Sequence, residues 1–278
     1  DSVGIIDSFF PQADFFTEPE RFDRHLDKLR RKGRDSKIDY VSICSPNYLH
    51  DSHIRMALRN DANAICEKPL VLNPWNIDGL EEIEKETDKK IFNILQLRHH
   101  PSIVALKEKF DNVPDDKIHD IELTYITSRG KWYFYSWKGD ITKSGGIVTN
   151  IGIHFFDMLS WIFGEVKNNT VHLLQENKAA GLLQLKKANV KWFLSLDKND
   201  LPKQAADKGI PTYRSITIDE KEIEFSGGFT DLHTESYQSV LDGKGFRISE
   251  SRNSINIVHT IRSNKPIGLK GDYHSFLK

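Results

Sequence analysis

The chain has 278 residues, of which 38% are hydrophobic and 28% are charged, and its 39 Lys and Arg residues nearly balance its 40 Asp and Glu residues. This is an ordinary globular composition without a global basic field, so it favours neither nucleic acid nor a membrane surface as a partner. We find no run approaching the roughly 18 apolar residues of a transmembrane helix and no leader pattern at the start, and we expect a cytoplasmic protein. The two cysteines, Cys44 and Cys66, each end an apolar run, which is typical of free thiols in a reducing compartment. A chain of this length exceeds the usual size of one domain, so we expect two.

Residues 1–116 alternate short apolar runs with amphipathic stretches, the pattern of parallel strands joined by helices. We predict strands at 40–44, 64–66 and 91–95 and helices at 21–31, 50–59 and 76–86. This is a Rossmann-like, dinucleotide-binding α/β domain. No G-x-G-x-x-G precedes Tyr40, so we expect the sheet to lack its first β-α unit, and with it the contacts to the adenosine half of a dinucleotide.

Residues 117–278 change to strands with a period of two, as in 190–196, where Val190, Trp192, Leu194 and Leu196 share one face. Similar runs occupy 119–127, 170–175, 180–186, 214–218 and 222–225, and helices are predicted at 146–163, 231–241 and 249–262. We predict an α+β domain with a large, open, mainly antiparallel sheet. An apolar sheet face has to be covered, so we also expect a homo-oligomer.

The segment Glu67-Lys68-Pro69 follows a short apolar strand directly. Ligands of alternating strand and helix folds bind at the carboxyl ends of the strands, so a lysine there is placed for chemistry. The alternative is a surface lysine before a turn proline.

Asn150, His154 and Asp157 fall on one polar stripe of an otherwise apolar predicted helix. Such a stripe must face something polar, either a ligand or partners in the core. The preceding Gly145-Gly146 pair permits a close backbone approach to a ligand at the helix amino end, or forms a simple loop.

Three further segments carry candidate contacts. The turn Ser45-Pro46-Asn47, with His50, follows one strand, and 96–101 follows another; each can contact a nucleotide or act only as a turn and helix cap. The adjacent His99 and His100 do not make a metal site, because neighbouring residues point apart and no Cys or acidic ligand is near in sequence. The aromatic and basic segment 129–140 can hold phosphates and stack a ring, or can cover the sheet as a packed loop.

Taken together, these motifs resemble the glucose-fructose oxidoreductase/inositol dehydrogenase/MocA (Gfo/Idh/MocA) family over essentially the whole chain. The segments 45–50, 136–140, 149–157 and 229–237 look more narrowly like bacterial UDP-N-acetylglucosaminuronate 3-dehydrogenases, NAD-dependent enzymes of lipopolysaccharide O-antigen biosynthesis. The resemblance implies a nucleotide-sugar substrate, NAD as cofactor, a tetramer and a cis peptide at Lys68-Pro69. It implies Lys68 and His154 as the catalytic pair. The implied substrate-binding residues are Asn150, Asp157, Arg129, Tyr133, Trp137 and Lys138, and the implied cofactor-binding residues are Ser45, Pro46, Asn47, His50, Glu67, Lys68, Gln96 and Arg98.

Oxidation of a secondary alcohol needs a base for the hydroxyl proton. We assign that role to His154, whose ordinary pKa is near 6.5, whereas Lys starts near 10.4. We assign Lys68 to stabilising the developing alkoxide. Many family members carry Asp where this chain has Asn150, and because an amide cannot accept a proton, a relay through that position is absent here. Another sugar or cyclitol dehydrogenase, or a non-catalytic regulator on the same fold, stays open.

Overall fold

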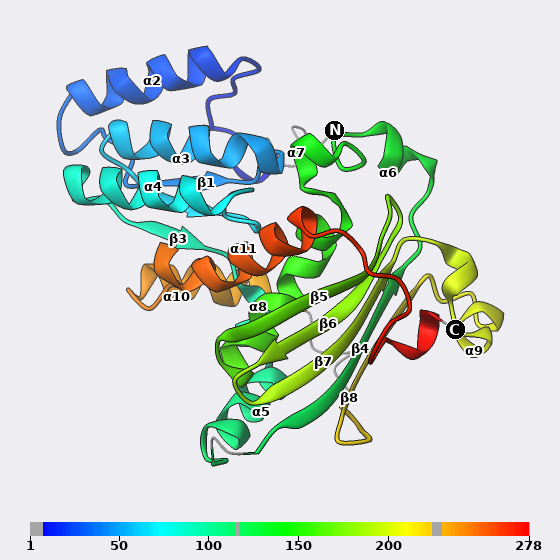
Figure 1. The fold of residues 1–278 in the computed structure, drawn as a ribbon. Helices are drawn as coiled ribbons and strands as arrows, with labels where there is room; N and C mark the ends of the chain where they lie inside the picture. Colours follow the sequence, from blue (N-terminus) through cyan, green and yellow to red (C-terminus); the bar gives the residue numbers. More distant parts are fainter. Residues whose placement is uncertain (1–7, 115–116, 224–229, 278) are drawn as a thin grey trace.

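A computed structural model describes residues 8–114, 117–223 and 230–277. Two sheets organise these residues (Figure 1), one with three parallel strands and one with six strands. The predicted fold class, a Rossmann-like sheet followed by a larger and mainly antiparallel sheet, is confirmed.

The smaller sheet has the strand order β1-β2-β3. In β2, Ala64, Ile65 and Cys66 are all buried, as expected of a parallel strand covered on both faces. The helix α4 begins with a proline in its first turn, where the fixed backbone angle of proline favours helix entry. The strands of this part are β1 (Tyr40–Ile43), β2 (Asn63–Cys66) and β3 (Ile91–Asn93), and its helices are α2 (Pro19–Arg31), η1 (Asn47–Leu49), α3 (His50–Arg59), α4 (Pro74–Thr87) and η2 (Gln96–His99). The next helix, α5 (Pro101–Asp111), lies beside the larger sheet (Figure 1).

The larger sheet has the order β5-β6-β7-β4-β8-β9, in which only the β4–β7 pair is parallel among the described strands. Of the predicted run at 222–225, residues 224 and 225 lie outside the described residues. The strands are β4 (His119–Thr127), β5 (Val166–Leu174), β6 (Lys178–Leu185), β7 (Ala188–Ser195), β8 (Thr212–Ile218) and β9 (Lys221–Ile223), and the short helices around them are α6 (Lys131–Tyr135), α7 (Ile141–Ser144), η4 (Lys198–Asp200), α9 (Lys203–Asp207) and η5 (Ser275–Leu277).

One face of the larger sheet packs on a central apolar helix that begins with a π turn, η3 (Val148–Gly152), and continues as α8 (Ile153–Phe163). The ring of Phe156 packs edge-on against that of Trp192 of β7, with ring centres 5.2 Å apart. The helical stretch Ile141–Phe163 is long and apolar enough to cross a membrane, contrary to our expectation that no run comes close, but 78% of its most apolar window is buried. Its apolar length reflects packing within the protein, because both the sheet and the flanking helices cover it.

The last two long helices, α10 (Leu232–Leu241) and α11 (Ile248–Ser263), return to the smaller sheet (Figure 1). Val240 of α10 packs with Ile65 and Phe92, and the backbone N–H of Asn93 donates to the backbone carbonyl of Phe246 at 2.9 Å. The boundary we predict at 116/117 falls beside residues outside the described part and stays a prediction. The chain crosses between the two sheets more than once.

The second face of the larger sheet is divided into an apolar and a polar part. Phe193 and Ile126 lie in a small apolar cluster that Leu277 helps to cover. The rest is a hollow of about 800 Å³ lined mostly by polar and charged residues, Lys191 and Glu122 among them. The chain's own carboxyl-terminal residues pack on the apolar part of this face, and the homo-oligomer that we expect stays a prediction.

Candidate active site

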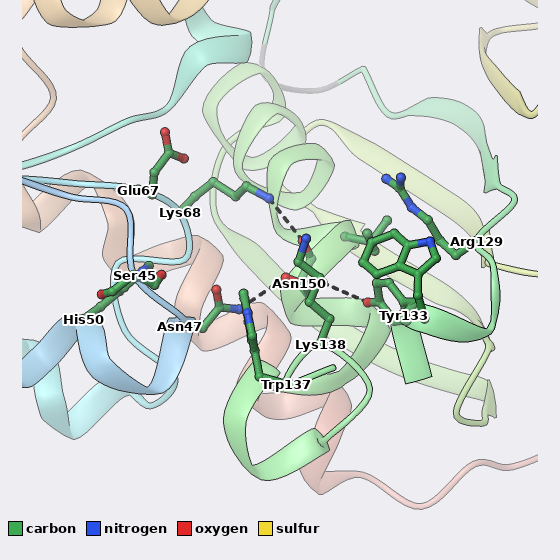
Figure 2. Close-up of a pocket in the computed structure, with 12 residues that line it drawn as sticks. Ser45, Asn47, His50, Glu67, Lys68, Arg129, Tyr133, Trp137, Lys138 and Asn150 are labelled. Carbon is green, nitrogen blue, oxygen red and sulfur yellow. Dashed lines mark hydrogen bonds between the residues drawn. The ribbon is translucent and has the colours of Figure 1, made fainter. Parts of the chain in front are cut away.

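Two adjoining cavities lie where the carboxyl ends of β1, β2 and β3 face the helix that begins with the π turn. They share Lys68, Arg129, Asn150 and Ile151. The first cavity, of about 230 Å³, is also lined by Ser45, Asn47, His50, Glu67, Trp132, Tyr133, Trp137 and Lys138 (Figure 2). The second, of about 170 Å³, is also lined by Gln96, Leu97, Tyr125, His154, Phe155 and Arg214. The two candidate catalytic residues, Lys68 and His154, thus line one cavity.

Lys68 extends from the end of β2 toward the π turn. Its peptide bond to Pro69 is cis, as the resemblance implies, and its Nζ donates to the carbonyl oxygen of Asn150 at 3.1 Å. Removal from water lowers the pKa of Lys68 to about 8, while Glu67 opposes that change and Lys138 adds to it. At pH 7 the ammonium form still predominates, although it gives up its proton far more readily than an ordinary lysine.

Asn150 lies in the middle of the π turn and is nearly inaccessible. Its Nδ2 donates to the hydroxyl of Tyr133 at 2.8 Å, and its Oδ1 accepts from Nδ2 of Asn47 at 3.4 Å (Figure 2). π turns within α-helices are frequent at functional sites. Here the Asn150 amide joins α6 and the turn after β1 to the helix that carries His154, so the substrate contact that we predict for Asn150 would have to share these hydrogen bonds.

His154 follows the π turn directly, on α8. Burial lowers its pKa well below the ordinary 6.5, and the positive charges of Lys68, His233 and Arg214 lower it further. His154 is therefore neutral at pH 7 and has a nitrogen able to accept a proton.

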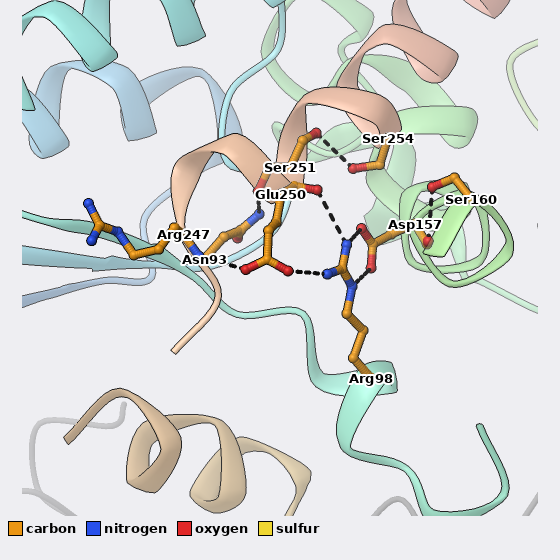
Figure 3. Close-up of polar contacts among 8 residues, drawn as sticks. All are labelled: Asn93, Arg98, Asp157, Ser160, Arg247, Glu250, Ser251 and Ser254. Atoms are coloured by element: carbon orange, nitrogen blue, oxygen red, sulfur yellow. Dashed lines mark hydrogen bonds and ion pairs between the residues drawn. The ribbon is translucent and has the colours of Figure 1, made fainter. Parts of the chain in front are cut away.

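Arg98 and Asp157 pair with each other (Figure 3), although we predict them to bind cofactor and substrate respectively. Nε and Nη2 of Arg98 donate to the two oxygens of Asp157 at 2.9 and 2.8 Å, and each side chain is only 4% exposed. Nη1 of Arg98 also contacts Glu250 of α11 at 2.6 Å. Neither residue lines either of the two cavities, and Asp157 instead borders a small void of about 10 Å³ beside Lys68 and His154. This geometry favours a structural role, in which the pair joins the strand-end segment η2 to α8 and α11.

The turn after β1 brings Ser45, Asn47 and His50 to the first cavity, and their contact with a cofactor stays a prediction. Pro46 is not among the described lining residues of this cavity. Both ring nitrogens of His50 face carbonyl oxygens, those of Pro69 at 2.7 Å and Ser45 at 2.8 Å. Burial lowers the pKa of His50, and both carbonyls oppose this because they favour a ring that donates twice. His50 thereby ties the turn after β1 to the segment that carries Lys68.

The segment 129–140 forms the opposite wall of the first cavity. The ammonium of Lys138 lies 5.2 Å from the ring centre of Trp132 and 5.8 Å from that of Trp137, within the range of cation–π contact. The predicted Arg129, Tyr133, Trp137 and Lys138 all line this cavity, and Trp132, which we did not single out, joins them.

Gly145 and Gly146 form the end of α7 rather than an open helix end. Both have positive φ, +78° and +71°. The amide of Gly145 donates to the carbonyl of Ile141 at 2.9 Å, and that of Gly146 donates to Oγ of Ser144 at 3.0 Å. With both amides bonded, the turn alternative accounts for this pair.

The sequence did not reveal Tyr125 and Arg214, which line the second cavity. They lie directly opposite each other on the antiparallel strands β4 and β8. These strands are far apart in the sequence, so only their pairing brings the two side chains together.

The comparisons with known proteins agree with this geometry. Residues 1–94 match the model of the oxidoreductase family's NAD-binding Rossmann fold, and residues 116–200 match that of its carboxyl-terminal α/β domain, both under the Gfo/Idh/MocA name. The chain belongs to the Gfo/Idh/MocA oxidoreductase family. It therefore carries that family's NAD-binding Rossmann domain, and the predicted family is confirmed.

Among solved structures, the WlbA (WbpB) dehydrogenase from Thermus thermophilus, in complex with NAD and UDP-GlcNAcA, is 48% identical with a TM-score of 0.94, over 99% of this chain and 88% of that one. The WlbA dehydrogenase from Bordetella pertussis, with NADH and UDP-GlcNAcA, has the same fold at 17% identity and a TM-score of 0.72, over 98% of this chain and 87% of that one. The myo-inositol 2-dehydrogenase of Thermotoga maritima is 30% identical over 131 residues, 47% of this chain. That match spans only 38% of the inositol enzyme's length.

Proposed function

We propose that this protein is an NAD-dependent oxidoreductase that oxidises the 3-hydroxyl of a UDP-N-acetylglucosaminuronate-type nucleotide sugar to the 3-keto product. The observation that carries the proposal is that Lys68 and His154 line the same cavity at the strand ends. The 48% identity over 99% of the chain to a dehydrogenase solved with NAD and UDP-GlcNAcA supports the cofactor and the substrate class.

The residues of the two cavities fit the nicotinamide part of such a cofactor. The side-chain oxygen of Gln96 is buried and lacks a hydrogen-bond partner among the described residues, so it can accept from a ligand in the second cavity. Ser45, Asn47, His50 and Glu67 would hold the cofactor at the strand ends, which is where ligands of this fold bind. When bound, NAD supplies the acceptor for the hydride that leaves the sugar carbon.

In the proposed reaction, the carbon–hydrogen bond at C3 breaks with its electron pair, and the hydroxyl proton leaves to a base. His154 is neutral at pH 7 and takes this proton. Lys68, mostly ammonium at pH 7, donates a hydrogen bond to the oxygen and stabilises its developing negative charge. The carbonyl of Asn150 holds the ammonium in place at 3.1 Å.

The pH dependence of kcat/KM separates this assignment from its opposite. If Lys68 acts as the charged stabiliser, kcat/KM falls as the pH rises through its pKa of about 8; if Lys68 is the base, kcat/KM rises over the same range. In our assignment both Lys68→Met and His154→Asn lose turnover. Near-normal turnover in His154→Asn together with an inactive Lys68→Met would move the base role to Lys68.

The proposed function itself is tested by NADH formation at saturating NAD, because we expect few contacts to the adenosine half of the cofactor, and by calorimetric binding with UDP-GlcNAcA, UDP-GlcNAc, glucose 6-phosphate and myo-inositol. We expect both turnover and binding with UDP-GlcNAcA. Activity on inositol alone would instead identify a cyclitol dehydrogenase. A protein that forms no NADH and binds no nucleotide sugar would be a regulator on this fold.

Three finer parts of the proposal concern the cell. We place the reaction in lipopolysaccharide O-antigen biosynthesis, in the cytoplasm, and in a homo-tetramer, all through the family resemblance. The oligomer is checked by light scattering, and a monomer at micromolar concentration would contradict it. The pathway assignment is checked by deleting the gene, which should abolish O-antigen. Expression of the active protein should restore O-antigen, and expression of the Lys68→Met variant should not.

A further inference from the structure

The second cavity concentrates positive charge beside the catalytic pair. Lys68, Arg129 and Arg214 all line it, and none of its described lining residues carries a carboxylate. Its volume of about 170 Å³ is small compared with the ~300–1,000 Å³ of most ligand pockets, so it can admit about one ring with its substituents. A confined site with this charge favours an anionic group on that ring.

Arg214 is held on the wall of this cavity by the larger sheet. It lies opposite Tyr125 across the β4–β8 pair, and its guanidinium carbon is 5.3 Å from the centre of the Tyr125 ring. That ring in turn packs against Phe155, the neighbour of His154 on α8, with ring centres 4.8 Å apart. The guanidinium is therefore fixed with respect to the catalytic histidine.

The charge of Arg214 also acts on His154, which lines the same cavity. The positive charge of Arg214 contributes to the lowered pKa of His154, after burial and the charges of Lys68 and His233. The guanidinium thus acts electrostatically on the point where the reacting hydroxyl would lie.

We propose that Arg214 binds the carboxylate of the substrate's sugar ring, and that this contact makes the enzyme select sugar acids over neutral sugars. The inference rests on the proposed function and assigns its substrate class to one residue. Guanidinium and carboxylate groups match in shape and form paired, charge-assisted hydrogen bonds.

The chemistry of the ring favours the carboxylate over the diphosphate as the partner of Arg214. In a hexuronate the carboxylate is attached at C5 and the nucleotide at C1, on opposite sides of C3. A ring whose C3 lies at Lys68 and His154 can present only one of these two groups to Arg214. The nucleotide needs far more room than the second cavity offers, and the first cavity, with Trp132, Trp137 and Lys138, adjoins it.

The test compares UDP-GlcNAcA with UDP-GlcNAc, which differ only in the C5 substituent. For Arg214→Gln we expect kcat/KM and affinity for UDP-GlcNAcA to fall roughly 10- to 150-fold, the usual effect of losing a hydrogen bond to a charged group. The affinity for UDP-GlcNAc and the inhibition constant of UDP stay unchanged, and kcat/KM for UDP-GlcNAc falls less than that for UDP-GlcNAcA. Arg214→Lys keeps the charge but not the paired geometry, so it shows a smaller loss.

The matched control is Arg252→Gln on α11, where the arginine is 34% exposed and pairs with Asp78 and Glu81. It should change neither substrate's kinetics. An equal loss for both nucleotide sugars, or a weaker inhibition by UDP in Arg214→Gln, would assign Arg214 to the diphosphate and overturn the inference. If Arg214→Gln does not fold, as judged by its thermal transition, an Arg214→Lys variant with an unchanged ratio of the two substrates also overturns it. Failure of the wild-type protein to bind either nucleotide sugar would refute the proposed function, and with it this inference.

Discussion

The buried pair between Arg98 and Asp157 offers the sharpest test of how the two sheets are held together. The perturbation is Arg98→Met, which keeps an apolar side chain of similar length but removes both hydrogen bonds to Asp157, 2.8 and 2.9 Å long. Both side chains are 4% exposed, so the carboxylate left behind cannot turn to water. Breaking such a pair on one side costs about 3–5 kcal/mol of unfolding free energy. At roughly 2–4 °C per kcal/mol for a chain of this size, Tm falls by roughly 10 °C.

The loss of stability in Arg98→Met should depend on pH. Burial raises the pKa of Asp157, the charge of Glu250 adds to this, and Arg98 lowers that pKa. Without Arg98 the folded-state pKa rises further above the unfolded value of 3.8, so the native state binds more protons than the unfolded state above that pH. Stability is then lost as the pH rises through this window. We expect Arg98→Met to be less destabilised at about pH 5 than at about pH 8.

Denaturant unfolding measures these free energies, and two further variants make the result specific. Arg98→Met combined with Asp157→Asn removes the orphaned charge, so the double variant should be more stable than the sum of the two single losses predicts. Arg252→Met on α11 breaks an exposed cluster and should cost less than about 1 kcal/mol. If Arg98→Met costs no more than Arg252→Met, or if the two single losses simply add, the pair does not connect the sheets as described.

Three more predictions use single sites. Gly209→Ala introduces only the backbone strain of a φ of +65°, whereas Gly145→Ala, at a φ of +78°, also places its Cβ 2.6 Å from a threonine side chain. We therefore expect Gly145→Ala to lower the free energy of unfolding, measured with denaturant, by about 1–3 kcal/mol more than Gly209→Ala does. Equal losses would contradict the packing at the end of α7. His274 is fully buried and its pKa is lowered from 6.5 to about 4. Between these pH values the native state binds fewer protons than the unfolded state, so the free energy of unfolding falls by about 3 kcal/mol as the pH drops from 6.5 to 4. His274→Asn should flatten that slope, and an unchanged slope would exclude the residue as its source. Cys44 is exposed, whereas Cys66 is buried and burial raises the pKa of its thiol. Ellman's reagent should therefore react with one thiol in the native protein and with two after denaturation. Two thiols that react fast in the native protein would show that β2 is not covered.

Much of the fold follows from local patterns in the sequence. The helix at 50–59 and the strand at 119–127 have their predicted bounds, and most other predicted elements differ by a few residues at the ends, whereas the helix α5 was not predicted. This agreement arises because a period of two or 3.6 reports which side chains of one segment face the core. The same patterns missed the π turn at 148–152, since one extra residue in a helical turn hardly changes the apolar periodicity.

The candidate site shows where local patterns stop being sufficient. Lys68 and the turn at Ser45 lie at strand ends, so their place in the site follows from the strand and helix alternation alone. His154 and Asp157 share one helical stripe, yet His154 lines the cavity and Asp157 pairs with Arg98. Only the position of Arg98 on a segment far away in the sequence separates the two.

The sequence by itself thus determined the order of the elements, the family and the position of Lys68 at a strand end, because each depends on residues close together in the chain. The tertiary structure decided which polar groups already have partners and which face a cavity. Asn150 and Asp157 are bonded within the protein. Arg214 lines the same cavity as Lys68 and His154, although its strand lies some sixty residues from His154 in the sequence. Partners of buried charges come from distant segments, and no local pattern encodes them.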